Sequence, residues 1–277
     1  MPLSARRHVR RMRGGAQAHL IEADDGNCYV VKFLNNPQHR RILINELIGS
    51  SILRYLQLAV PQPALISVSG EFLARHPDVS IELGTRRASV AAGWHFGSQF
   101  PGDPERLAVY DFLPDALLRQ VNNLAHFRGA LVADKWMANA DMRQAVFFRA
   151  RIAGWAPAAE VHPRKVGFVA CLVDQGFVFN GPHWDFPDSP LQGLAARPVV
   201  YEDIRSLEDF QPWLDLVVNF PEEVADQARR QVPLQWLDGD GAALDDLLER
   251  LLLRRSRVPQ LIEECRRARA ALFPNWR

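Results

Sequence analysis

The stretch from 133 to 147 constrains the fold of this chain more than any other part of its sequence. Two carboxylates and one carboxamide fall within eight residues there, namely Asp134, Asn139 and Asp141. Upstream, apolar residues at spacings of three and four predict a helix over 123–137, with Asn123 as its cap and Asp134 on its inner face. A buried carboxylate without a partner is costly, so Asp134 needs either a partner or a chemical role. We expect a polar loop after this helix and then a strand at 146–148.

The composition excludes several classes of protein. The chain has 277 residues, 33 basic and 32 acidic, and its net charge of +1 creates no global field that would recruit nucleic acid or a membrane. No window approaches 18 apolar residues, so we expect no transmembrane segment, and no apolar run marks a signal peptide. The basic cluster at 6–13 could contact phosphate, but we expect a solvated, partly disordered terminus. Three widely separated cysteines indicate buried, reduced thiols in a cytoplasmic protein: Cys28, Cys171 and Cys265.

A glycine-containing hairpin opens the chain. Gly14 and Gly15 precede a predicted strand over 16–23, and an Asp-Asp-Gly-Asn turn leads to a second strand over 28–34. Glycine N–H groups can approach phosphates closely, and a lysine can meet phosphate as a point charge. Lys32 lies late in the second strand on the same face as two apolar residues. The hairpin therefore predicts a phosphate-binding device, although most such hairpins are structural only.

A long helix follows this hairpin and supplies a partner for Lys32. The pattern predicts the helix over 38–58, with Glu46 on a side that carries apolar groups. Two charged residues that both point inward from adjacent elements favour an ion pair between Lys32 and Glu46, whereas the alternative is a solvated glutamate. Further short strands are expected at 64–68, 72–74, 79–83 and 88–96. The Gly- and Pro-rich segment 97–104 is the strongest candidate for a linker.

Beyond this linker the chain is mainly helical. A strand over 166–173 ends in Asp174-Gln175-Gly176, and the carboxyl end of a buried strand is a natural place for a metal-binding acid. Gly176 would permit a sharp turn beside Asp174. Helices are expected at 115–122, 123–137, 207–218, 222–231, 242–255 and 259–272. The leucine stripe of the helix over 242–255 is more typical of a core than of a partner surface.

Taken in order, these parts match the needs of phosphoryl transfer. That reaction uses a lysine and backbone donors to hold phosphates, acids and an amide to hold magnesium, and a carboxylate to accept or orient the proton of the nucleophile. The hairpin glycines and Lys32 fit the first role, and Asp174 with the polar loop fits the second. Each motif is weak by itself, but their order along the chain is more specific.

These residues make the chain resemble the HipA-like kinases, a bacterial branch related to type II phosphatidylinositol kinases. The resemblance covers 9–194 and rests on four segments, 29–33, 45–47, 134–143 and 173–177. It implies an α+β, two-lobed protein-kinase-like fold. The N-terminal ATP-binding lobe would span 1–98 and contain the small sheet and the long helix. The larger, mainly helical catalytic lobe would span 99–277.

The resemblance also implies a role for each matched residue. Asp141 takes the place of the catalytic acid, and Asp134 and Asn139 support its loop. Asp174 would hold Mg2+, while Lys32 and Glu46 match the ATP lysine and its helix partner. The remaining expected ATP contacts are the loop glycines and the hinge that would meet adenine: Gly14, Gly15, Trp94, His95 and Phe96.

One departure from the family pattern leaves the metal site open. Relatives usually carry a magnesium-binding Asn five residues after the catalytic Asp, where this chain has Val146. Gln144 could supply the missing oxygen. Alternatively, Asp134 is the catalytic acid and Asn139, five residues later, is the metal ligand. A weaker catalyst or a pseudokinase is the third reading of the same departure.

The resemblance implies an ATP- and Mg2+-dependent phosphotransferase of the cytoplasm that acts on a protein Ser/Thr. A nucleotide-binding regulatory scaffold without turnover is a competing hypothesis, and a kinase of a small molecule or lipid headgroup is another. HipA proteins can pair with a DNA-binding antitoxin, so an antitoxin-type protein is a candidate partner and a toxin–antitoxin role stays open. The sequence itself contains no element that reads nucleic acid.

Overall fold

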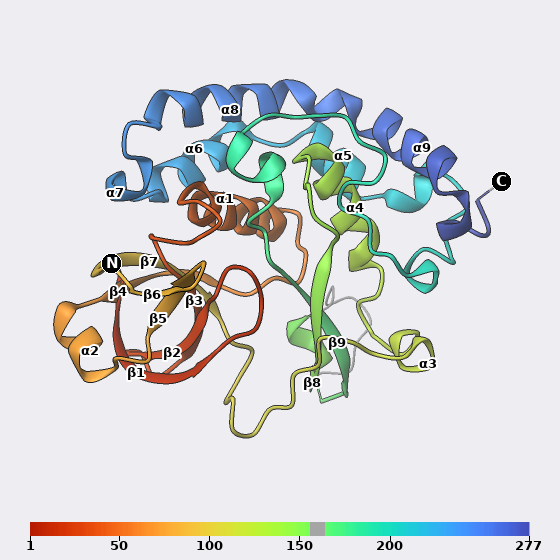
Figure 1. Ribbon diagram of the computed structural model, residues 1–277. Coiled ribbons are helices and arrows are strands. Elements are labelled where there is room, and N and C mark those ends of the chain that lie inside the picture. The colour runs from red at the N-terminus through yellow and green to blue at the C-terminus, as the bar shows by residue number, and fades with distance from the viewer. Residues whose placement is uncertain (156–163, 277) are drawn as a thin grey trace.

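The computed structural model describes residues 1–155 and 164–276. A β-rich N-terminal part and a mainly helical C-terminal part lie side by side, and helix α1 (Arg41–Tyr55) runs between the barrel and the C-terminal helices (Figure 1). This arrangement confirms the predicted α+β architecture. The expected division at 98/99 falls inside strand β7, one residue before that strand ends.

Five strands of the N-terminal part close into a barrel in the order β1-β2-β3-β7-β4. Their bounds are β1 (Leu3–Arg11), β2 (His19–Ala23), β3 (Cys28–Lys32), β4 (Pro63–Val68) and β7 (Gly93–Gln99). Neighbouring strands pair antiparallel except β1 and β4, whose parallel pairing closes the barrel. The predicted turn joins β2 to β3, and Gly26 adopts a φ of 79° there. Buried apolar side chains fill the interior, among them Ile21, Val31, Phe33, Ile66 and Val68.

The basic cluster at 6–13 forms most of strand β1, so its expectation as a disordered terminus is wrong. Ala5 of this strand is buried, whereas the arginines face outward, and Arg7 pairs with Glu22 of β2 at 2.8 Å. The barrel needs β1 to join β2 and β4, because otherwise both of those strands would present unpaired edges. Charge on one face of a strand does not prevent that pairing.

A short excursion covers the barrel between β4 and β7. It contains helix α2 (Gly70–Arg75) and a hairpin of β5 (Ser80–Leu83) and β6 (Arg86–Ser89). The strand predicted at 72–74 is wrong, because Ser69 caps a helical turn by accepting a hydrogen bond from the backbone N–H of Phe72 at 3.0 Å. The predicted strand at 88–96 is divided between β6 and β7.

Helix α1 is buried on nearly every side. Eleven of its fifteen residues are buried, as is typical of a helix enclosed by protein rather than one at a surface. Asn45 fixes one side of α1, because its side-chain amide donates to the carbonyls of Gly176, Val178 and Gly181 at 2.8–3.0 Å. The segment that follows strand β9 is thereby tied to the helix that carries Glu46.

The C-terminal part consists of one hairpin and a set of helices. The hairpin pairs β8 (Gln144–Arg151) with β9 (Val166–Val173). The helices are α3 (Asp115–Leu118), α4 (His126–Trp136), α5 (Trp213–Val218), α6 (Glu222–Gln231), α7 (Leu234–Leu237), α8 (Gly241–Leu253) and α9 (Val258–Ala268). The leucine stripe of α8 faces the core as predicted, with Leu244, Leu247, Leu248 and Leu251 buried. Within the described ranges, no helix combines the length and the hydropathy needed to cross a membrane.

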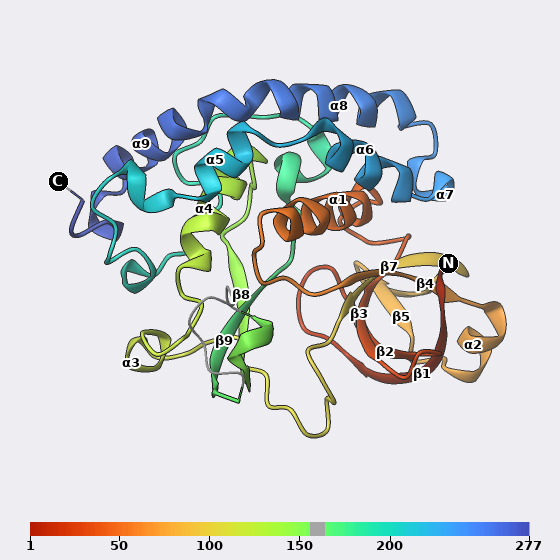
Figure 2. The same cartoon turned by 180° about the vertical axis from the view of Figure 1, so that it is seen from behind.

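Helix α4 brings the polar loop to the hairpin, since it lies between α5 and the β8–β9 hairpin (Figure 2). Asn123 does not cap it, because α4 begins at His126 and has no side-chain cap. Instead, Asn123 exchanges two 2.8 Å hydrogen bonds with the backbone of Ala170 in β9. A buried strand backbone needs partners for its N–H and C=O groups, and Asn123 provides both. All three cysteines are buried and free, as predicted.

Candidate functional site

Three charged side chains from distant parts of the sequence meet at the junction of the two parts. Lys32, the last residue of β3, forms ion pairs with Glu46 of α1 and, at 2.7 Å, with Asp174. Burial alone would lower the pKa of Lys32, but the two carboxylates outweigh it and raise that pKa. The backbone N–H of Gln175 donates to the other oxygen of Glu46 at 3.0 Å. Glu46 therefore holds Lys32 and the start of the turn after β9 together, and the predicted pair is present.

Asp174 is the first residue after β9, and its backbone is in the left-handed region with φ of 62°. Non-glycine residues rarely adopt this conformation, which aims the carboxylate at Lys32. The side chain is 33% exposed, so it remains accessible. Burial would raise its pKa, but the Lys32 ammonium outweighs burial and lowers it, which keeps Asp174 ionised.

Gly176 serves a different purpose from the predicted one. The positive φ of the turn belongs to Asp174, not to Gly176. A Cβ on Gly176 would lie 2.7 Å from Ile42 and 3.4 Å from the Glu46 carboxylate. This glycine is therefore needed because α1 packs directly against the turn.

Asp134 is wholly buried in an ion pair with Arg143. The guanidinium contacts both carboxylate oxygens, one at 2.8 Å, and Asn139 donates to the same carboxylate at 3.0 Å. Burial would lower the pKa of Arg143, but the Asp134 carboxylate outweighs it and raises the pKa, so the guanidinium stays charged. Gly193 lies so close that an added Cβ would sit 2.1 Å from the Asp134 side chain. These contacts leave no room for an acceptor group at Asp134.

Asp141 occupies the opposite end of the same loop and is partly exposed. Its carboxylate accepts the backbone N–H of Met142 at 2.8 Å and the side-chain amide of Gln144 at 3.1 Å. Asn139 connects the two acids, because its oxygen accepts the backbone N–H of Asp141 at 3.2 Å while its amide holds Asp134. The loop thus places one acid in the interior and one at the surface.

A cavity of about 400 Å³ lies beside these groups, between the barrel and the C-terminal hairpin. Its walls include Val30 of β3, Val146 of β8 and Val173, the residue directly before Asp174. The size falls within the range of small-molecule sites in proteins. A lining that combines apolar side chains with arginines suits a base attached to an anionic chain. Val146, the residue that departs from the family pattern, is part of the apolar wall.

The strand that carries the predicted hinge ends later in the chain than predicted. Trp94, His95 and Phe96 do not line this cavity, whereas the residues of 98–101 do. Phe96 is buried, and the ring of His95 is enclosed, with its Nδ1 accepting the backbone N–H of Leu34 at 2.9 Å. The prediction placed the end of the strand at Phe96. Because β7 continues to Gln99, the connection between the two parts shifts by several residues toward the C-terminus.

The start of the chain contributes positive charge that the sequence analysis missed. Arg10 and Arg13 line the same cavity, and neither side chain has a hydrogen-bond or ion-pair partner in the described residues. Arg11 differs, because it pairs with Glu82 at 2.6 Å. The predicted Gly14 and Gly15 lie in the exposed β1–β2 loop, where Gly14 has φ of 116°. A basic run directly before a Gly-Gly turn was the available signal, but it was read as a disordered end.

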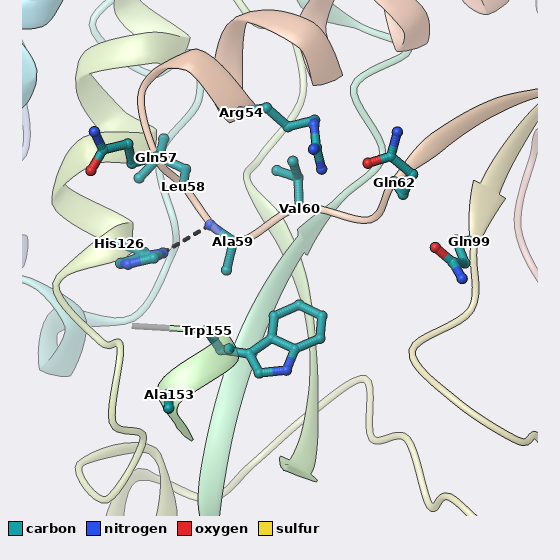
Figure 3. A pocket seen from close by; sticks show the side chains of 11 residues that line it. Arg54, Gln57, Leu58, Ala59, Val60, Gln62, Gln99, His126, Ala153 and Trp155 are labelled. Atoms are coloured by element: carbon teal, nitrogen blue, oxygen red, sulfur yellow. Dashed lines mark hydrogen bonds between the residues drawn. The ribbon is translucent and has the colours of Figure 1, made fainter. Parts of the chain in front are cut away.

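A second cavity, of about 460 Å³, contains none of the predicted site residues (Figure 3). It lies at the C-terminal end of α1, and its lining includes Arg54, Gln62, His126 and Trp155. His126 accepts the backbone N–H of Ala59 at 2.9 Å, and burial lowers its pKa to about 4, so its ring is neutral. Gln99 borders both cavities, which places this one on the other side of the hinge. Among the described residues, none of the predicted site residues is part of the lining of either cavity.

The donors present fit a magnesium ion held through one carboxylate. Magnesium usually keeps several waters and binds through one or two carboxylates plus substrate phosphates. Asp174 provides an accessible carboxylate, and the Gln144 side chain lies next to Asp141. Asn139 is buried with both ends of its amide engaged, and Val146 has no ligand atom. In the described part of the chain, no three His, Cys, Asp or Glu side chains form a group that could hold a metal by themselves.

Comparison of the fold with solved structures identifies a kinase-like architecture. The chain is similar over 97% of its length to two crystal structures of the Golgi casein kinase, one of them with Mn/ADP bound. The TM-score is 0.51 and the sequence identity 12% in both cases, and the match covers 74% and 73% of those chains. At this identity the likeness concerns the fold, which is therefore protein-kinase-like.

Comparison of the sequence gives the family. No curated protein matches the chain. A family model described as HipA-like kinase matches residues 7–146, which include the second part of β1, Lys32, Glu46 and the loop up to Val146. Because this match spans just over half of the sequence and the fold agrees with it, the chain is a kinase-like phosphotransferase that belongs to the HipA-like kinase family.

Proposed function

We propose that this protein transfers the γ-phosphoryl group of ATP to a Ser or Thr hydroxyl of a protein, with Mg2+ as its cofactor. The observation that carries the proposal is the ion-pair cluster of Lys32, Glu46 and Asp174. Lys32 and Asp174 lie close in the chain to two wall residues of the 400 Å³ cavity, Val30 and Val173. The Golgi casein kinase, which has a similar fold, has been solved with Mn/ADP bound, and this supports a nucleotide together with a divalent metal.

In this proposal, each member of the cluster has one task. Lys32 binds phosphate oxygens, and Glu46 keeps its ammonium charged and aimed at the cavity. Asp174 holds the metal, and Gln144 is the candidate for a further oxygen ligand. Bound magnesium would neutralise negative charge on the phosphates. Replacing an ion-pair partner of Lys32 by a phosphate costs little, because Glu46 remains in place as its second partner.

The geometry favours Asp141 as the catalytic base over Asp134. A base must come within hydrogen-bonding distance of the acceptor hydroxyl, and only Asp141 has surface access. The acceptor oxygen bonds to the γ-phosphorus as the bond from that phosphorus to the β–γ bridging oxygen breaks and ADP leaves. The hydroxyl proton passes to a carboxylate oxygen of Asp141. Asp134 is a positioning residue that acts through Asn139 on the loop.

The second candidate function is a nucleotide-binding regulatory scaffold without turnover, and Val146 is the residue that supports it. An apolar side chain at that position removes one expected metal ligand. Arg10 and Arg13 could offset this loss, because they bring two unpaired positive charges to the same cavity. A small-molecule or lipid acceptor has no comparable support in the cavity walls. Three buried, free cysteines are consistent with the proposed cytoplasmic location.

The test combines nucleotide binding with phosphoryl transfer. Mg-ATP is expected to raise the melting temperature of the protein, and Asp174→Ala is expected to remove that shift. Mass spectrometry of autophosphorylation or of a protein acceptor should detect product with the wild type and none with Asp141→Asn. Binding without product would favour the scaffold, whereas an unchanged melting curve at millimolar Mg-ATP would contradict both functions.

A further inference from the structure

A third cavity, of about 310 Å³, opens against the polar loop on the side of β8 that faces α4. Its walls are mostly apolar side chains from separate elements: Leu118, Phe127, Met142, Phe147, Ala196 and Val200. Nothing assigned so far uses this space. Phe127 and Phe147 are buried, whereas Met142 is 59% exposed and Ala196 is exposed, so the cavity has a buried floor and an accessible rim.

The cavity is continuous with the site of the proposed reaction. Gln144 lines it and donates to the carboxylate of Asp141 at 3.1 Å. Asp111, Val146 and Val173 are shared walls, because they line both this cavity and the nucleotide-sized one. A side chain seated here would therefore lie next to the acid that receives the acceptor proton.

Of the charged side chains that line the cavity, one has no partner among the described residues. Arg143 is neutralised by Asp134, and Arg197 pairs with Asp115 and donates to the carbonyl of Leu113 at 2.9 Å. Asp111 is exposed and, within the described residues, has no hydrogen-bond or ion-pair partner. The mouth of the cavity is thus apolar with one free negative charge, which favours a cationic neighbour on whatever binds.

Exposed aromatic residues extend the apolar rim on the Asp111 side. Tyr110 is 46% and Phe112 63% exposed, and they flank Asp111 in the chain. Tyr110 is fixed to the hairpin by two 2.8 Å backbone hydrogen bonds with Phe147. Arg197 lies 4.6 Å over the ring of Phe112. These contacts hold the rim in place, and a rigid apolar rim around an apolar cavity is typical of recognition surfaces.

We propose that this cavity is the acceptor subsite for a large aliphatic or aromatic side chain that neighbours the phosphorylated Ser/Thr of a protein. A Lys or Arg of the same polypeptide segment pairs with Asp111. The inference rests on the proposed function, since it names the class of protein segment that the same site accepts. A polypeptide is favoured over a lipid because the cavity holds one side chain rather than a long acyl chain.

The test uses two sets of synthetic peptides. The first set contains a central Ser with Leu, Phe or Ala beside it and with Arg or Glu nearby, and kcat/KM is measured with Mg-ATP. We expect Leu or Phe to raise kcat/KM by about 10- to 100-fold over Ala, as burial of one such side chain provides. The second set replaces Ser by Ala, and its binding is measured by fluorescence anisotropy, which requires no turnover.

Two variants and one matched control connect the preference to the cavity. Ala196→Phe should fill the cavity and abolish the preference for Leu or Phe in both sets, while the melting-temperature shift with Mg-ATP stays unchanged. Asp111→Asn should abolish the preference for Arg over Glu. The control is Ala153→Phe, which adds the same group at an exposed position of the cavity in Figure 3 and should leave both preferences intact.

The outcomes separate this proposal from the proposed function. Peptide binding that Ala196→Phe weakens supports the subsite even if no phosphorylation occurs, and the proposed transfer reaction would then fail by itself. Phosphorylation of peptides without any preference for an apolar neighbour, or a preference that Ala196→Phe leaves intact, overturns the subsite. Phosphorylation of lipid vesicles containing phosphatidylinositol, with no binding of either peptide set, overturns it as well.

Discussion

The ion pair of Asp134 with Arg143 predicts that Asp134→Asn lowers the free energy of unfolding far more than Asp141→Asn, although both make the same chemical change. The side chain of Asp134 is 0% exposed and that of Arg143 is 1% exposed. Asp134→Asn keeps the shape of the side chain but removes its charge, so the Arg143 guanidinium is left buried and uncompensated. Breaking a buried pair in this way costs about 3–5 kcal/mol. Total folding stabilities are about 5–15 kcal/mol, so this loss is a large fraction.

The cost is measured by urea unfolding, followed through tryptophan fluorescence, and by thermal melting. A loss of this size corresponds to a fall in Tm of roughly 6–20 °C for a domain somewhat smaller than this one. Asp141→Asn is the matched control, since it makes the same chemical change at a partly exposed position, and its effect should stay within about 0.5 kcal/mol. Phosphoryl transfer should show the reverse order, with Asp141→Asn inactive and Asp134→Asn weakened in proportion to its unfolding.

A double variant decides whether the uncompensated charge is the cause. Replacing both partners, as Asp134→Leu with Arg143→Met, should recover most of the stability, because a buried pair can be exchanged for apolar residues at little cost. The reasoning is refuted if Asp134→Asn unfolds at the same urea concentration as the wild type. It is equally refuted if folded Asp134→Asn binds Mg-ATP normally but has no activity, since Asp134 would then be the catalytic acid.

Two further predictions concern the nucleotide and pH. Arg13→Ala and Arg10→Ala should each weaken binding of metal-free ADP about tenfold, because a charge-assisted contact to phosphate is lost. Calorimetry measures this effect, and binding of adenosine should not change. Equal weakening of ADP and adenosine binding would contradict the prediction. Burial lowers the pKa of His19, His95 and His126 to about 4 each. Below pH 6.5 the unfolded chain therefore binds more protons than the folded one. The free energy of unfolding should fall as the pH decreases from 6.5 toward 4, by about 1.4 kcal/mol per pH unit for each histidine. His126→Gln, which keeps an acceptor for Ala59, should make the urea midpoint less dependent on pH in that window; an unchanged dependence would exclude its contribution.

Most of the secondary structure followed from local sequence. Turn residues and apolar periodicity predicted the β2–β3 hairpin, α1, the strand over 166–173 and the helical C-terminal half, because these signals act between neighbouring residues. Two of the errors share one physical origin. Strand β1 and the end of β7 are defined by pairing with strands far away in the chain, and no local pattern reports that pairing.

The same division applies to the site. The inward positions of Lys32 and Glu46 could be predicted from the faces of a strand and a helix, and their ion pair is present. The basic run at 6–13 was a local signal for phosphate contact, but the position of Arg10 and Arg13 at this cavity depends on closure of the barrel around β1. The end of β7 differs from the prediction for a related reason, because the length of this strand is set by its partners β3 and β4.

The polar loop separates most clearly what sequence and tertiary structure determine. The sequence by itself established that two acids and an amide lie within eight residues, after a helix that turns Asp134 inward. It left the roles of Asp134 and Asp141 open, because spacing along a chain does not specify which carboxylate meets a cation. Tertiary structure buried Arg143 against Asp134 and left Asp141 at the surface beside the cavity. The desolvation of one acid and the exposure of the other depend on contacts with 173–193, which only folding brings to the loop.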